Sequence, residues 1–170
     1  NLYAGDANRF PSMIEWLYAR SQSGVVASGQ LYPYLKSKAV YLCPKDAPRA
    51  SGSSAPALPA SVTYDHSYTM NCRMCHARDV SKVLAPSKTV YFVEATNLAP
   101  NINSASIAPP GDSFGPFSSS GGQLGFRHNA RLHVQMVDTH VERLKAKQVS
   151  SATDKRLWFP NNDTAFTPGL

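Results

Sequence analysis

The residues of this chain that are best spaced for chemistry lie in the segment 72–76, which reads Cys-Arg-Met-Cys-His. Cys72 and Cys75 followed directly by a histidine match the spacing of c-type haem attachment, in which both thiols are attached to the haem and the histidine binds the iron. Together with Cys43, the same residues supply three thiolates and one imidazole, a ligand set for structural zinc. Three cysteines could also form one disulfide and leave one thiol free. These residues alone leave haem c, zinc and a disulfide as alternatives.

A second group of candidate residues lies near the C-terminus, where His128, Asp138 and His140 could converge around a predicted hairpin. Imidazole and carboxylate can bind a divalent metal, but an Asp in a turn commonly hydrogen-bonds the nearby backbone, and we expect that role for Asp138. The loop 97–122 offers few carboxylates for calcium, which usually needs several. We therefore predict no metal ligands and no resident cofactor.

Two common catalytic signatures are absent from the sequence. It has no His-Glu-x-x-His and no phosphate-binding loop. The run Ser-Ser-Ser-Gly-Gly at 118–122 lacks the strand-to-helix context of a phosphate cradle. We predict no catalytic residue and a protein that is not an enzyme.

Basic residues outnumber acidic ones by 17 to 11, and the formal net charge is +6. This balance permits attraction to nucleic acid, anionic glycans or acidic lipids without selecting one of them. A candidate patch for DNA or an anionic glycan is made by five basic residues near the C-terminus: Arg127, Arg131, Arg143, Lys145 and Lys147. A solvated strand face is the simpler interpretation of the same residues.

The elements that must position these residues are a helix followed by short strands. Ser12 and Glu15 form a capping box, which predicts a helix that begins at Ser12 and ends at Gly24. Apolar and alternating runs predict short strands at 39–42, 62–70, 89–93, 132–137, 140–144 and 156–159. The strands 132–137 and 140–144 should form a hairpin. Because Thr139 stands where such turns favour glycine, we expect a wider turn or a bulge.

The fold class that these elements predict is α+β, in a single domain over 1–170. An N-terminal helical part, 1–24, should pack on a small antiparallel sheet of four to five strands within 39–145, followed by a C-terminal segment, 146–170. The polar segments 47–61 and 97–122 should be long loops. A charged fraction of only 16%, with 13 Pro and 10 Gly, argues against a helical bundle or a coiled coil.

Three stretches in order resemble the globular heads of bacterial pilin-like proteins. Residues 2–11 are similar to the end of the long N-terminal helix of that family. Residues 40–46 resemble a short strand closed by Cys-Pro-x-Asp, and residues 67–71 resemble a strand that reads Ser-Tyr-x-Met-Asn. The landmark residues of the second stretch are Cys43, Pro44 and Asp46.

The most specific part of the resemblance lies at the C-terminal end. One branch of the family carries a histidine, nine residues, and then Asp-Gly. Here His128 is followed after nine residues by Asp138, with Thr139 in place of the glycine. This replacement of glycine by Thr139 affects the expected structure of the hairpin tip more than the expected fold.

The resemblance implies a type IV pilin or type II secretion pseudopilin fold and a structural role in a filament or secretion apparatus. Members of the family carry a leader that prepilin peptidase removes, and an apolar helix that anchors the subunit in the inner membrane and later packs in the filament core. This sequence carries neither, so we expect a soluble, trimmed head. The implied location is the cell envelope, first as an inner-membrane precursor and then as a periplasmic or extracellular filament.

The resemblance also implies partners and a state for the thiols. The expected partners are further copies or other pilin-like subunits, the secretion or pilus machinery, and a host-surface or anionic ligand; the membrane is reached only through the missing helix. An envelope location favours a disulfide from Cys43 to Cys72 or Cys75 over zinc. The alternatives of function are a c-type electron carrier and a pilin-like module that binds DNA or anionic glycan.

Overall fold

The computed structural model describes residues 16–17, 25–46, 66–71, 73–74, 79–96, 106–107, 123–150, 155–158 and 160. Within these residues the strands are β1 (Tyr68–Asn71), β2 (Val90–Thr96), β3 (Ser106–Ile107), β4 (Gln123–Leu124), β5 (Arg131–Met136) and β6 (Val141–Lys145). The α-helices there are α1 (Tyr32–Leu35), α2 (Ala146–Ser150) and α3 (Lys155–Trp158), and the 3-10 helices are η2 (Val26–Ser28), η3 (Lys38–Tyr41) and η4 (Val80–Lys82).

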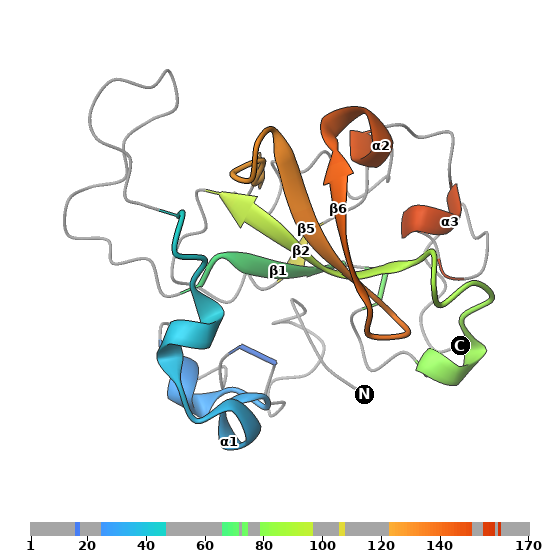
Figure 1. Cartoon of the computed structure of the whole chain (residues 1–170). Coiled ribbons are helices and arrows are strands. Elements are labelled where there is room, and N and C mark those ends of the chain that lie inside the picture. The colour runs from blue at the N-terminus through green and yellow to red at the C-terminus, as the bar shows by residue number, and fades with distance from the viewer. Residues whose placement is uncertain are drawn as a thin grey trace.

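The strands form one sheet around β2. Across the described residues the order is β3-β1-β2-β5-β6, and β4 pairs with the far end of β2 (Figure 1). β1, β2, β5 and β6 are antiparallel neighbours, whereas β3 runs parallel to β1. The small antiparallel sheet of the predicted α+β fold is therefore confirmed, and the described helices are few and short.

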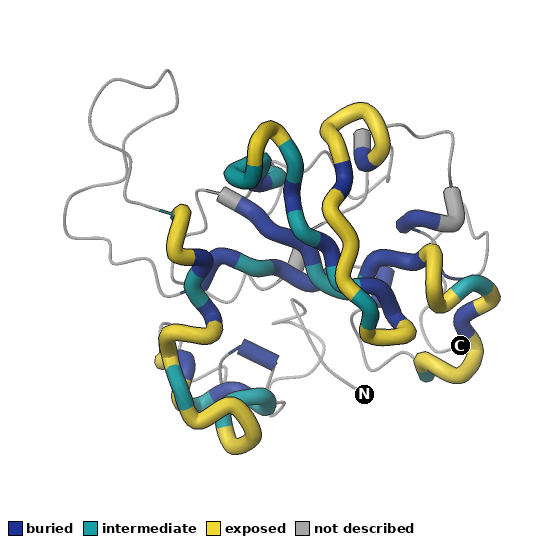
Figure 2. Tube along the Cα trace, in the orientation of Figure 1, coloured by how far each residue is buried: buried dark blue, intermediate teal, exposed yellow. Residues whose placement is uncertain are grey.

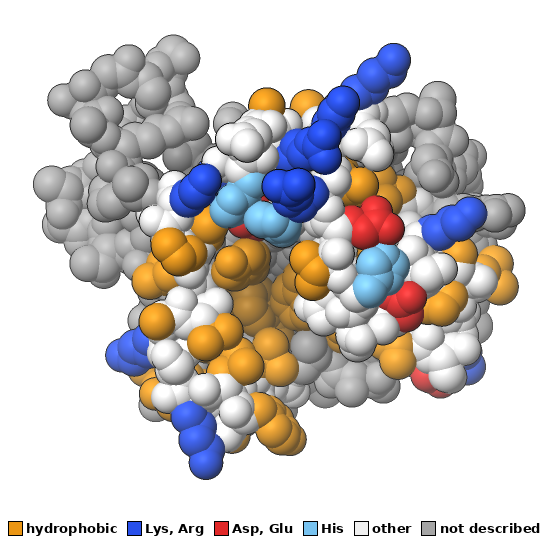
Figure 3. All heavy atoms as spheres, viewed as in Figure 1, with side chains coloured by type: hydrophobic (Ala, Val, Ile, Leu, Met, Phe, Trp, Pro, Cys, Tyr) orange, Lys and Arg blue, Asp and Glu red, His pale blue; other side chains and the backbone are white. Residues whose placement is uncertain are grey.

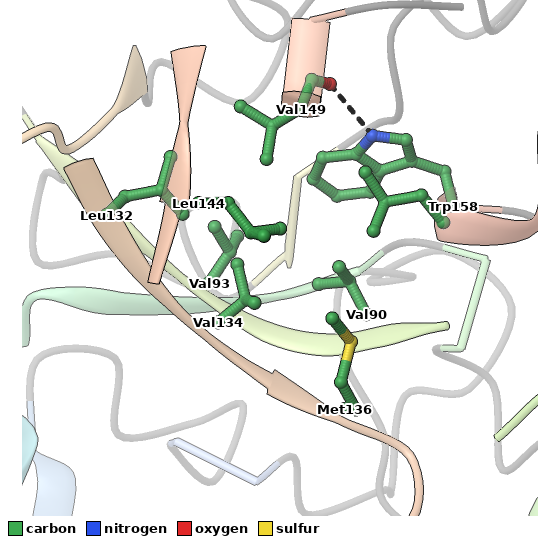
Figure 4. Close-up of a cluster of buried hydrophobic side chains, with 9 residues drawn as sticks. Val90, Val93, Leu132, Val134, Met136, Leu144, Val149 and Trp158 are labelled. Carbon is green, nitrogen blue, oxygen red and sulfur yellow. Dashed lines mark hydrogen bonds between the residues drawn. The ribbon is translucent and has the colours of Figure 1, made fainter. Parts of the chain in front are cut away.

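One face of the sheet carries the larger hydrophobic core. β5 alternates half-buried and buried residues, and its buried side chains are Leu132, Val134 and Met136. They pack with residues of β2 and β6 beneath α2 and α3 (Figure 4). Trp158 closes this core, and its indole Nε1 donates to the backbone oxygen of Val149 at 3.0 Å.

The opposite face is covered by the N-terminal part of the described chain. Trp16 packs edge-on against Phe92 of β2, with ring centroids 4.9 Å apart, and stacks on Tyr41. Leu17, Val26 and Met70 are the other buried members of this smaller cluster. Figure 2 shows the contrast between the buried central strands and the exposed β6. β6 is an edge strand, which is where charged side chains commonly discourage pairing with other chains.

Two of the predicted strands are wrong. Residues 38–41 form η3, because a helical turn buries Tyr41 while Val40 stays 53% exposed. Residues 155–158 form α3, which lays Trp158 across the core and is not a strand at the sheet edge. The strands predicted at 89–93, 132–137 and 140–144 are confirmed as β2, β5 and β6.

The predicted wider turn of the last hairpin is also confirmed. Thr139 N–H donates to Met136 O at 3.0 Å, and Met136 N–H donates to His140 O at 2.9 Å, which closes a loop of three residues. Thr139 lies in the left-handed region with φ of 80°. This is the usual geometry of a three-residue hairpin loop, in which glycine is favoured at the left-handed position.

Several predictions fall on other parts of the chain. β1 covers the end of the strand predicted at 62–70, and residues 62–65 lie outside the described residues. So do the loop 47–61 and, apart from residues 16–17, the helix predicted from Ser12 to Gly24. Within 97–122 the structure describes only β3.

Candidate functional site

Cys43 lies beside Ser67, the residue before β1, and hydrogen bonds of its backbone hold it there. Its N–H donates to Ser67 Oγ at 2.9 Å, and Asp46 N–H donates to Cys43 O at 2.8 Å. Pro44 is exposed in the resulting turn, at the second position, where proline is favoured. The Cys43 side chain thereby points into the protein and the residue is 4% exposed.

Glu94 lies on the central strand β2 and is 1% exposed. The chain pairs with β2 at β4, keeps one more backbone bond to it from Gly125 N–H to Glu94 O at 2.9 Å, leaves it over residues 126–130, and pairs with it again at β5. The Glu94 carboxylate lies beside this break, where Oε2 accepts the backbone N–H of His133 at 2.8 Å. The Glu94 carboxylate thus takes the place of a backbone acceptor for the His133 N–H. This hydrogen bond offsets part of the cost of burying the carboxylate.

His128 is presented by a tight turn inside the same break. His128 N–H donates to Arg131 O at 3.1 Å and Arg131 N–H donates to His128 O at 3.2 Å. Asn129 and Ala130 between them both have φ of 55°, the signature of a type I′ turn. The imidazole is directed back toward β2, with Nε2 2.8 Å from Glu94 Oε1.

Cys43, Glu94 and His128 therefore form one group, which we call the Cys43–Glu94–His128 cluster. Cys43 Sγ lies 3.4 Å from His128 Nε2, and one ligand atom from each residue lies within 4.8 Å of the other two. Burial raises the pKa of the Cys43 thiol, and the Glu94 carboxylate adds to this, while the Lys45 backbone N–H and Arg127 oppose it. Within the described part of the chain, no other group of three His, Cys, Asp or Glu residues has metal-binding geometry.

Arg127 joins the cluster to the turn that carries Cys43. Its Nη2 lies 2.7 Å from Asp46 Oδ2 and also donates to the backbone oxygen of Ala95. The two charged side chains are only 9% and 11% exposed. A Cβ on Gly125 would lie 2.5 Å from Arg127 Nη1, so any side chain there would have to displace the guanidinium that pairs with Asp46.

The disulfide predicted from Cys43 is wrong, because Cys43 is a free thiol. Its Sγ lies 3.4 Å from His128 Nε2 and close to the Glu94 carboxylate. Cys72 and Cys75 lie outside the described residues, so the haem motif stays a prediction. Met74, between them in sequence, is buried against Val83 and Val137.

Asp138 and His140 lie at the tip of the β5–β6 hairpin and do not join His128. Asp138 Oδ1 accepts the backbone N–H of His140 at 3.3 Å, so the predicted side-chain to backbone role is confirmed. The His140 ring also lies between Asp138 and Glu142, at 2.5 and 3.0 Å. Sequence inspection missed Glu94; its only signal is an acidic residue that ends an apolar run, Val-Tyr-Phe-Val-Glu.

The predicted basic patch loses one member and keeps the others. Arg127 is wrongly assigned to it, because it is buried in the ion pair with Asp46. Arg131 is half-buried opposite Lys145, while Arg143, Lys145 and Lys147 are exposed at the sheet edge. Basic side chains and imidazoles gather together on this part of the surface (Figure 3).

An apolar groove of about 520 Å³ runs beside this basic region. Trp16, Tyr41, Phe92 and Val141 contribute to its walls, and His133 stands at the border between the groove and the Cys43–Glu94–His128 cluster. In Figure 3 it is the hollow lined by apolar side chains in the middle of the face.

Comparisons of this chain with protein-family models, curated proteins and solved structures gave no match. Among the described helices, none has both the length and the apolar character needed to cross a bilayer.

Proposed function

We propose that this chain is the globular head of a pilin-like subunit, a structural and interaction protein of a type IV pilus or a type II secretion pseudopilus. The observation that supports this best is the contact between the segments that carry the family resemblance. Asp46 pairs with Arg127 across 81 positions, and Cys43 meets His128 across 85. Ser67, from the third segment, accepts the N–H of Cys43. Matches that arose by chance would have no reason to meet in one place.

The proposed fold includes the predicted N-terminal helix, packed on the groove face of the sheet. Support comes from Trp16 and Leu17, which belong to that predicted helix and are buried against β2 and η3. The groove beside Trp16 leaves apolar surface on the same face. A surface of this kind is typical of a site of protein association.

In this proposal the head has no catalytic cycle and works by lateral packing. Its partners are further copies or other pilin-like subunits and the assembly machinery, and its location is the cell envelope. Val141 is 63% exposed at the groove, which makes it the residue with which to test packing.

The test is expression of the gene, with its natural upstream sequence, in cells that have a prepilin peptidase and an assembly system. We expect mass spectrometry to find a processed N-terminus and sheared filaments or pseudopili to contain the chain. Processing should fail in cells without the peptidase. A plain secretory signal and a protein that never enters the sheared fraction would contradict the proposal.

A matched pair of variants tests the packing surface. Val141→Asp places a charge at the groove, and it should reduce incorporation into filaments while thermal stability changes little. Leu84→Asp is the control, because Leu84 is 70% exposed and does not line the groove. Equal incorporation of both variants would argue against the groove as a packing surface.

A second candidate function is binding of DNA or an anionic glycan by the basic edge of the sheet. The observation that favours it is the exposure of Arg143, Lys145 and Lys147 on and directly after one edge strand. Replacing all three by Ala should weaken binding to duplex DNA or heparin and flatten its dependence on salt. The charge-matched control replaces three exposed lysines elsewhere: Lys38, Lys45 and Lys88. Binding that is lost equally in both triple variants would reflect net charge alone.

A further inference from the structure

The Cys43–Glu94–His128 cluster brings a thiol, a carboxylate and an imidazole from three separate segments to one point. Cys43 follows η3, Glu94 belongs to β2, and His128 comes from the turn before β5. Hydrogen bonds to neighbouring residues fix each of the three. Cys43 N–H donates to Ser67 Oγ, and the Glu94 carboxylate accepts the N–H of His133. The backbone of His128 forms two reciprocal bonds with the backbone of Arg131. Donor atoms that are fixed in this way need little reorganisation to bind a common ligand.

The contacts within the cluster converge on one nitrogen atom. Both Cys43 Sγ and Glu94 Oε1 approach the same atom, His128 Nε2, at 3.4 and 2.8 Å. An N–H on Nε2 points in one direction, so it can be directed at the oxygen or at the sulfur but not well at both. A cation among the three atoms would be contacted by all of them.

We propose that Cys43, Glu94 and His128 bind one Zn²⁺ ion, with water in the fourth position. The ligand types fit, because thiolate and imidazole suit zinc, whereas calcium and magnesium require oxygen. The charges also fit, because a thiolate and a carboxylate together neutralise a divalent cation in a buried place. Binding displaces the thiol proton to solvent, so each ion bound releases a proton from Cys43.

The distances are close to those of a tetrahedral site. With Zn–S of about 2.3 Å and Zn–N of about 2.05 Å, tetrahedral angles put sulfur and nitrogen about 3.6 Å apart, against 3.4 Å for Cys43 Sγ and His128 Nε2. Nitrogen and oxygen ligands should lie about 3.4 Å apart, against 2.8 Å for His128 Nε2 and Glu94 Oε1. The carboxylate therefore has to move by roughly 0.6 Å. The 19% exposed side chain of His128 leaves a path for entry.

The surrounding residues act as an outer shell. The backbone N–H of His133 orients the Glu94 carboxylate, and the Asp46–Arg127 pair fixes the turn that presents Cys43. Outer-shell contacts of this kind commonly tune metal affinity. The ion would join the turn after η3 to β2 and to the β4–β5 connection, which is a structural role compatible with the proposed head.

The experiment uses the whole chain without a metal-binding tag, stripped by a chelator and kept reduced. A Cys72→Ser/Cys75→Ser variant serves as the reference, because Cys43 is then the only cysteine. We expect it to bind one Zn²⁺ by calorimetry and to gain a thiolate-to-cobalt charge-transfer band with Co²⁺. Absence of that band, or loss of zinc binding in this variant, would overturn the proposal and point to the 72–76 motif.

Single substitutions in the reference variant identify the ligands. Glu94→Gln and His128→Ala should each weaken zinc binding by more than about 100-fold, since outer-shell losses alone reach 10- to 100-fold. His140→Ala is the control, because that histidine also lies between carboxylates but is outside the cluster. If Glu94→Gln fails to fold, the cobalt charge-transfer band of the reference variant still tests whether Cys43 binds the metal. Unchanged affinity in His128→Ala would contradict the site.

Discussion

Arg127 and Asp46 form an almost fully buried ion pair, with Nη2 and Oδ2 2.7 Å apart, between the turn after η3 and the connection before β5. Nε and Nη1 of Arg127 are buried and have no hydrogen-bond partner in the described part of the structure. Asp46 is therefore the counter-charge on which the burial of this guanidinium depends. The pair holds together two segments that are 81 positions apart.

Asp46→Asn should destabilise the protein by about 3 kcal/mol, because removing one partner of a buried pair leaves the other charge uncompensated. Urea unfolding followed by fluorescence would measure this. The double variant Asp46→Asn/Arg127→Met should cost less than the sum of the two single changes. Asp79→Asn, at an exposed cap, is the control and should have a much smaller effect. Additive effects would show that the pair is not coupled.

Gly125→Ala should destabilise the protein by about 1–3 kcal/mol through overpacking. The new Cβ would lie 2.5 Å from Nη1 and 2.9 Å from Cζ of Arg127, whose guanidinium is fixed by Asp46. Thermal or urea unfolding would measure the loss. The cost should shrink in an Arg127→Ala background, because the atoms that clash are then gone. An equal loss of unfolding free energy in both backgrounds would show that the clash with Arg127 is not the reason for a glycine at position 125.

Ala130→Gly should stabilise the protein by about 0.5–1 kcal/mol. Ala130 has φ of 55° in the turn that presents His128, and relief of left-handed strain exceeds the entropy that glycine adds to the unfolded chain. Thr139→Gly, at φ of 80°, should act in the same direction. Ala39→Gly, in η3 and without positive φ, is the control and should lower the unfolding free energy. A loss of stability in Ala130→Gly would contradict the strain argument.

His140 should make the β5–β6 hairpin more stable in mild acid than at alkaline pH. Hydrogen bonds to Glu142 and then to Asp138 raise the pKa of His140 above its ordinary value. A raised folded-state pKa gives stability that is fully present below the unfolded-state value of about 6.5 and is lost as pH rises through the folded value. An NMR titration of the imidazole would measure the pKa directly.

The control for this pH dependence is His140→Gln, which keeps a polar side chain and removes the titration. In the natural chain, the urea concentration at the unfolding midpoint should decrease as the pH is raised from mildly acidic to mildly alkaline. The fall should be smaller in the variant. Identical pH profiles for both proteins would show that the contacts to Asp138 and Glu142 do not bias the protonation of His140.

Strands with a regular alternation could be predicted from the sequence. In β5 the alternation of buried and half-buried residues requires only that one face of the strand be apolar, and this is visible in the sequence as Leu132, Val134 and Met136. The wider turn at Thr139 was also predictable, because a two-residue turn needs positive φ at both central residues and a β-branched residue disfavours it. The resemblance to pilin-like heads stays a proposal.

Short apolar runs could not be assigned in the same way. The segments that end at Tyr41 and Trp158 suit a strand or a helical turn equally well by periodicity. What decides between them is a distant partner: the ring of Trp16 for Tyr41, and the backbone oxygen of Val149 for Trp158. Local sequence carries no information about either contact.

The same division applies to the Cys43–Glu94–His128 cluster. The types and positions of Cys43 and His128 mark them as candidates in the sequence alone, but the sequence favours a disulfide for the first and groups the second with Asp138 and His140. Glu94 is not marked as a site residue by the sequence, because a carboxylate at the end of an apolar strand is normally solvated. Only the tertiary structure decides its role, since the break between β4 and β5 places His128 beside that buried carboxylate and the turn after η3 places Cys43 there.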